Sequence, residues 1–134
     1  MPQVFRSMKI DAVDGLPLRG QSATTIGVRQ SDFDIDAVTT EVAKNGKGMS
    51  VSPSCGQLPA ALRPTKFPGG LGRSNLFCCR LSVGQWRAGV VAPGLEMFPD
   101  PNDPDHGFLM PENPMPLKDL QDAVEATRPN WRVL

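Results

Sequence analysis

The chain has 134 residues, which suits one domain with a single hydrophobic core, and we expect residues 1–134 to form that domain. Its 14 basic and 14 acidic residues cancel, so net charge gives no reason to expect nucleic acid or an anionic membrane surface as the main partner. With 40% apolar residues beside 14 prolines and 13 glycines, the composition favours a loop-rich, strand-dominated domain over a disordered chain.

Short apolar runs bounded by glycine, proline or polar residues predict strands along most of the chain. We expect strands or extended segments at residues 4–8, 24–28, 32–38, 49–52, 75–81, 90–91, 95–98 and 106–110. Residues 58–62 are expected to form one helical turn, and the polar stretch "PDPNDPD" a tight loop.

A single amphipathic helix is expected near the C-terminus. Pro116 suits a first helical residue, and Leu117, Leu120 and Val124 follow at spacings that place them in one apolar stripe. Pro129 ends the helix, and Trp131 is expected to fold back onto the core. Many short strands with one helix predict an α+β domain.

The termini and cysteines favour action in a reducing cytoplasm. The opening "MPQVFRSMKID" lacks the apolar core of a secretory signal, and no apolar run approaches the length of a transmembrane helix. Three cysteines without a C-x-x-C spacing argue against a disulfide framework and a zinc site, so we expect buried thiols. Cys78 and Cys79 are adjacent in a predicted strand and should point to opposite faces.

Local motifs identify no catalytic centre. His106 is the only histidine, which excludes a metal site built from several histidines. Pairing of His106 with Cys55, Cys78 or Cys79 stays open, as does a Ser–His–Asp triad, and no G-x-S-x-G elbow or other local motif favours either.

The stretch "KNGKGMSVSP" resembles a phosphate-binding loop only superficially. A Walker loop needs serine or threonine directly after its Gly-Lys pair, and here Gly48 follows Gly46 and Lys47. We interpret the stretch as a flexible turn into a strand, on which Ser50 and Ser52 share one face.

Three motifs in order carry a family resemblance: "VFRSM", then "GKGMSVSP…LPAALRP", then "HGFLMPENPM" before the helix. The series, from Val4 to Trp131, resembles small bacterial type VI secretion toxins with an ADP-ribosyltransferase-like fold, and related single-domain proteins. The resemblance implies two small packed β-sheets that form a cleft, followed by a C-terminal amphipathic helix. It also implies NAD as substrate, with cleavage between nicotinamide and ribose through an oxocarbenium-like state.

The resemblance assigns candidate roles to four residues. Arg6 would anchor the dinucleotide, Ser50 and Ser52 would hold the ribose, and Glu112 is the candidate for the late glutamate that stabilises developing positive charge. His106 is a further catalytic candidate, although it could instead only anchor the polar loop.

Two departures from the family pattern limit the chemistry. The chain has no tyrosine, which excludes a His–Tyr–Glu site and leaves an Arg–Ser–Glu arrangement. Met110 stands where family members can carry an acid, and Glu112 lies two residues further on. We therefore expect a cytoplasm-acting toxin or effector that uses or cleaves NAD, with a cognate immunity protein as partner. The alternative is a catalytically inactive binding module of the same fold that acts through a protein partner.

Overall fold

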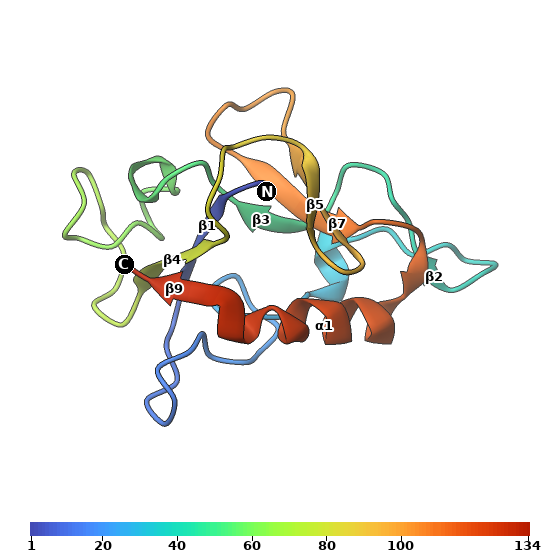
Figure 1. Cartoon of the computed structure of the whole chain (residues 1–134), viewed down its shortest axis with the longest axis horizontal. Coiled ribbons are helices and arrows are strands. Elements are labelled where there is room, and N and C mark those ends of the chain that lie inside the picture. The colour runs from blue at the N-terminus through green and yellow to red at the C-terminus, as the bar shows by residue number, and fades with distance from the viewer.

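The strands are short, as the frequent prolines and glycines predict, and they form three antiparallel sheets with one helix at the C-terminal end (Figure 1). The structure is a computed structural model that describes residues 1–134. The strands are β1 (Val4–Met8), β2 (Glu41–Val42), β3 (Met49–Val51), β4 (Phe77–Leu81), β5 (Gly89–Ala92), β6 (Leu95–Pro99), β7 (Gly107–Pro111), β8 (Met115–Pro116) and β9 (Trp131–Val133). The helix is α1 (Leu117–Ala126), and 3-10 turns occur at Gln30–Asp32, Cys55–Gln57 and Arg128–Asn130. The α+β class is thus confirmed.

The first sheet has the order β1-β4-β9, so the strand expected at residues 75–81 lies in its centre. The register places Arg6 of β1 opposite Cys79, and Trp131 of β9 opposite Leu81. The sequence did not predict β9 as a strand. Trp131 is nevertheless buried as expected, with 2% of its surface exposed.

The second sheet has the order β3-β7-β6-β5, and its edge strand β3 meets β1 of the first sheet. The contact is one antiparallel bridge, in which Phe5 and Ser52 exchange backbone hydrogen bonds of 2.9 and 2.8 Å. Arg6 follows Phe5 and Ser50 precedes Ser52, so in this antiparallel arrangement both lie on the same side of the bridge and are close together, although they are 44 positions apart in sequence.

Helix α1 covers the core with the predicted stripe. Leu120 and Val124 are buried, whereas Leu117 is half-buried and packs against the same core cluster. Pro116 precedes the first helical residue instead of being that residue, and it belongs to β8, which pairs with β2. Figure 1 shows the helix running beneath the sheets, with β9 continuing the chain back to β4.

The glycines of "KNGKG" serve the backbone of the turn into β3. Gly46 has a φ of 80°, which favours glycine. A Cβ at Gly48 would lie 2.1 Å from the carbonyl oxygen of Leu109 on the neighbouring strand β7. The expected strand at 49–52 is present as β3, and the bridge extends its pairing to Ser52.

Two expected extended segments do not form strands. Residues 24–28 and 32–38 make only isolated bridges, Arg19 with Ile26 and Ile35 with Val42. In the second segment the side chain of Asp36 accepts backbone hydrogen bonds from Val38 and Thr39, at 2.8 and 2.9 Å. Such local bonds close a turn and compete with strand pairing.

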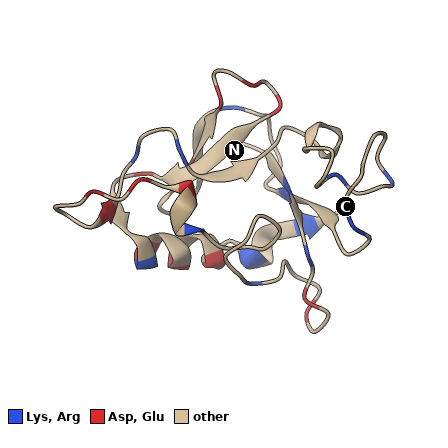
Figure 2. Cartoon of the chain, turned by 180° about the vertical axis from the view of Figure 1, so that it is seen from behind, with Lys and Arg blue, Asp and Glu red and all other residues tan.

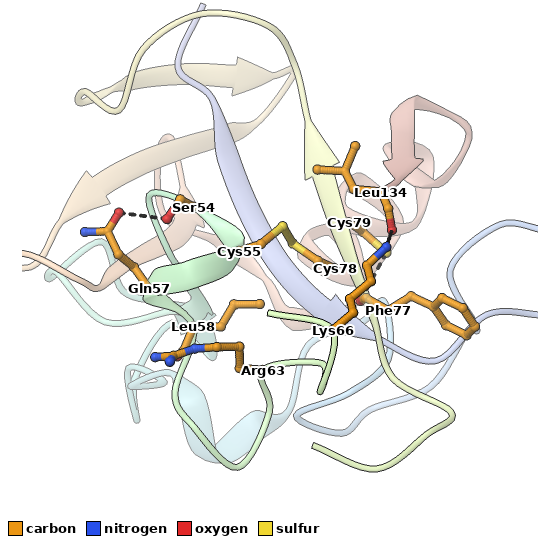
Figure 3. The surroundings of a disulfide bond; sticks show 10 residues. All are labelled: Ser54, Cys55, Gln57, Leu58, Arg63, Lys66, Phe77, Cys78, Cys79 and Leu134. Atoms are coloured by element: carbon orange, nitrogen blue, oxygen red, sulfur yellow. Dashed lines mark hydrogen bonds between the residues drawn. A yellow bond between two sulfur atoms is a disulfide. The ribbon is translucent and has the colours of Figure 1, made fainter. Parts of the chain in front are cut away.

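The expectation of three free thiols is wrong for two of them. Cys55 and Cys78 form a disulfide between the turn after β3 and strand β4 (Figure 3). Cys79 stays free and faces the main core, on the other side of β4 from Cys78, as the strand alternation predicted. The odd number of cysteines does not exclude a disulfide, because it only requires that one cysteine stays unpaired. The sequence alone does not show which two of the three lie close enough to bond.

No helix of the structure is both long and apolar enough to cross a bilayer, since α1 has 10 residues.

Candidate functional site

A cavity of about 200 Å³ opens beside the junction of β1 and β3. Its lining comprises Arg6, Ser7, Ala23, Arg29, Ser50, Val51, Ser52, Leu58, Pro59, Leu62 and His106. Four of the five sequence-predicted site residues, Arg6, Ser50, Ser52 and His106, therefore lie around one space. They come from β1, from β3 with the residue after it, and from the residue before β7.

Arg6 joins strand β3 to the loop after β1 by donating hydrogen bonds to backbone carbonyl oxygens. Its Nη1 donates to the carbonyl oxygen of Ser50 at 2.7 Å, and its Nη2 donates to those of Ser22 and Thr25 at 3.1 and 3.3 Å. Only 5% of the residue is exposed, and it forms no salt bridge. Burial lowers the pKa of Arg6 to about 10, so the guanidinium stays charged at neutral pH.

Two buried polar atoms at this cavity lack hydrogen-bond partners. They are Nε of Arg6 and Oγ of Ser7, and both residues line the cavity. Buried polar groups are almost always paired, so these two atoms are unusual, but protein atoms cover both of them. Arg29 adds a second guanidinium, which Asp32 partly neutralises through contacts of 3.1 and 2.9 Å. The cavity is suited to an anionic group.

His106 links the cavity to a carboxylate that the sequence analysis missed. Its Nε2 lies 3.1 Å from Oγ of Ser50, and its Nδ1 lies 3.1 Å from Oδ2 of Asp100. Asp100 also accepts a backbone hydrogen bond from Asn102 at 2.9 Å. This bond and then the contact with His106 hold the pKa of Asp100 below its usual range, so Asp100 is ionised at neutral pH.

The loop between β6 and β7 fixes the histidine in place. Backbone hydrogen bonds join Asp100 to His106 at 3.0 Å and His106 to Asp103 at 3.2 Å. The imidazole also meets the ring of Phe108 edge-on, with 4.6 Å between centroids. Figure 2 shows the acidic residues of this loop at the top of the molecule. The signal in the sequence was "DPNDPDH", whose aspartates close turns and bring its two ends together.

Of the two remaining candidates, Ser52 lines the cavity and Glu112 does not. Ser52 is buried, with 2% exposed, and lines the cavity. Glu112 lies beyond the far end of β7, where its N–H donates to Gly94. His106 and Glu112 flank this extended strand, which separates them by about 20 Å at the usual rise per residue. The structure does not bring Glu112 to the cavity.

A larger groove of about 720 Å³ is lined in part by Asp100. Lys44 and Lys47 line it, but they are already paired, with Glu96 at 2.6 Å and Asp34 at 3.1 Å. The smaller cavity is lined by Arg6, a buried cation without a carboxylate partner, which makes it the stronger candidate for a binding site.

Comparisons of the chain with models of known families, with curated proteins and with solved structures give no match.

Proposed function

We propose that the chain binds NAD at this cavity and breaks the bond between nicotinamide and ribose, as an enzyme with an ADP-ribosyltransferase-like fold. One observation carries the proposal. Four of the five candidate site residues, Arg6, Ser50, Ser52 and His106, line a single cavity. The toxin or effector role, with an immunity protein as partner, belongs to the same proposal and is supported by the motif order.

The cavity's charge supports binding of the pyrophosphate. Arg6 is a buried cation without a carboxylate partner, and Arg29 lies on the same wall. A phosphate group in the cavity would bring negative charge close to the guanidinium of Arg6. This group would compensate the desolvated charge of Arg6.

The size of the cavity suits one end of the dinucleotide. At about 200 Å³ it is smaller than typical pockets for whole ligands, which span roughly 300–1,000 Å³. A polar hollow of about 260 Å³ adjoins it and shares Leu58, Pro59 and His106. NAD would extend from one space into the other past the imidazole.

The negative charge that stabilises the departing sugar would come from Asp100 through His106. The cavity lining itself contains no carboxylate, and Glu112 lies elsewhere. Asp100 is ionised and hydrogen-bonded to the imidazole, so the pair places negative potential behind the serine-lined wall. Asp100 then replaces Glu112 as the carboxylate of the reaction.

The test is release of nicotinamide from labelled NAD, with and without a cell lysate that supplies acceptors. We expect the wild type to turn NAD over, and His106→Ala to lose about 100-fold or more of that rate. Glu112→Gln should retain turnover, and Glu125→Gln on the exposed face of α1 serves as the control. Loss of turnover in Glu112→Gln would return the catalytic charge to Glu112.

Calorimetry with NAD separates the two functional alternatives. Binding without release of nicotinamide or transfer of label would favour the inactive binding module. Absence of binding would overturn the NAD proposal altogether.

A further inference from the structure

Asp100, His106 and Ser50 form a continuous hydrogen-bonded series at the mouth of the cavity. The two contacts, from Oδ2 to Nδ1 and from Nε2 to Oγ, are each 3.1 Å. Ser50 is solvent-exposed on the edge strand β3, so its hydroxyl is accessible. A nucleophile, a base within hydrogen-bonding distance and a third group that orients the base are the elements of an activated hydroxyl.

The hydrogen bonds determine which nitrogen carries the proton when the imidazole is neutral. Ionised Asp100 can only accept, so Nδ1 carries the hydrogen and Nε2 presents a lone pair. Ser50 then donates its hydroxyl proton toward Nε2. This is the arrangement in which histidine takes a proton from serine.

We propose that Ser50 is a catalytic nucleophile that hydrolyses small carboxylic esters, with His106 as general base and Asp100 as the positioning residue. This activity goes beyond the proposed NAD chemistry and needs no dinucleotide.

The reaction balances within these groups and water. Oγ of Ser50 bonds to the ester carbonyl carbon while its proton passes to Nε2 of His106. The bond to the alcohol oxygen then breaks, and the alcohol leaves with the proton from Nε2. Water attacks the acyl-serine by the same route, which releases the carboxylic acid and restores the Ser50 hydroxyl.

The cavity limits the substrate to a short acyl group. Its volume is about 200 Å³, and Val51, Leu58, Pro59 and Leu62 give it an apolar wall. Arg6 lines the same space, and its positive charge stabilises the oxyanion that forms on the carbonyl.

The first test is labelling by a small alkyl fluorophosphonate, without NAD. Ser50 Oγ bonds to phosphorus, fluoride leaves, and His106 takes the serine proton. Peptide mass spectrometry should locate the label on Ser50, and hydrolysis of p-nitrophenyl acetate should stop in the labelled protein. His106→Gln and Asp100→Asn should each slow labelling by about 100-fold or more. Ser74→Ala, on an exposed loop, is the control and should label at the wild-type rate.

The second test reads the histidine directly in the wild-type protein. His106 is the only histidine, so its ring nitrogens give an unambiguous ¹⁵N spectrum. We expect the Nδ1–H tautomer in the wild type and a shift toward Nε2–H in Asp100→Asn. An Nε2–H tautomer in the wild type would overturn the proposal, as would a label on Ser50 that forms equally fast in His106→Gln. The proposal is also wrong if Ser50 labels no faster than Ser74.

Discussion

At the scale of single residues, Arg6 combines a structural role with a role at the cavity. Its guanidinium joins three carbonyl oxygens, two from the loop after β1 and one from β3, and it lines the space that we propose for an anion. The sequence pointed to Arg6 through its motif, but not to its burial. A charged side chain that satisfies backbone carbonyls cannot be removed without effect on the fold.

We predict that Arg6→Met lowers the free energy of unfolding by about 3–5 kcal/mol, because three carbonyls lose a charged donor in a buried setting. Urea unfolding measures the change. Arg29→Met is the matched control. Because the Arg29 side chain is 42% exposed and paired only with Asp32, its loss should cost about 1 kcal/mol or less. A wild-type unfolding midpoint in Arg6→Met would show that these hydrogen bonds contribute little to stability.

At the scale of elements, the sequence predicted what periodic patterns specify. The run "VFRSM" gave β1 with its observed bounds, and the stripe of Leu120 and Val124 gave the buried face of α1. The short pairing of β2 with β8 escaped prediction because two-residue strands carry no alternation. Strand β9 was missed because pairing with β4 makes it a strand, and pairing partners are long-range information.

In the candidate site, too, local sequence patterns identified some of the residues, while others depend on long-range contacts. The sequence offered five candidate residues, of which the fold brings four to one cavity, but it did not point to Asp100. Asp100 reaches His106 only because the loop between β6 and β7 folds back on itself. Asp100 and Asp103 both close turns in this loop, so the turn pattern alone does not show which aspartate meets the histidine. Only the three-dimensional structure shows that Asp100, and not Asp103 or Asp105, contacts the His106 side chain.

The disulfide also acts at the scale of elements, because it joins the turn after β3 to strand β4. Figure 3 shows Leu58 beside this turn, and Leu58 with Pro59 and Leu62 forms a wall of the cavity. The disulfide therefore restrains this wall of the cavity in the folded protein, and it also restricts the unfolded chain.

We predict that replacing Cys55 and Cys78 together by serine lowers the free energy of unfolding by about 3 kcal/mol, since the cross-link spans 23 positions. The wild type treated with a reductant should show the same fall, whereas the double variant should not respond. Thiol titration of the denatured, non-reduced wild type should find one free thiol among the three cysteines. Three free thiols would contradict the bridge.

At the scale of the whole molecule, Arg128 connects the two ends of the chain. It follows α1, and its Nη1 and Nη2 contact both oxygens of Asp14 at 2.6 and 2.9 Å, while its Nε donates to the carbonyl of Pro17 at 2.6 Å. These partners are 111 to 114 positions away. Because β1 and β9 also flank β4, both termini depend on a common set of contacts.

This connection should make stability depend on pH in the acid range. The hydrogen bond from Arg128, and then that from the backbone of Leu16, hold the pKa of Asp14 below its usual range. A lowered folded-state pKa means that the unfolded chain binds the proton more tightly. The contribution of Asp14 is therefore complete above the unfolded pKa of about 3.9 and is lost as pH falls through the lowered folded value.

We predict that wild type and Asp14→Asn differ in urea midpoint near neutral pH, and that the difference disappears as pH falls below about 4. Arg128→Gln provides the matched background, because Asp14 then keeps only its backbone partner at Leu16. In that background Asp14→Asn should change the neutral-pH midpoint less, and the difference between the two effects measures the coupling across the chain. Equal effects of Asp14→Asn in both backgrounds, or a difference that persists undiminished in acid, would mean that the charge pair does not stabilise the joined termini.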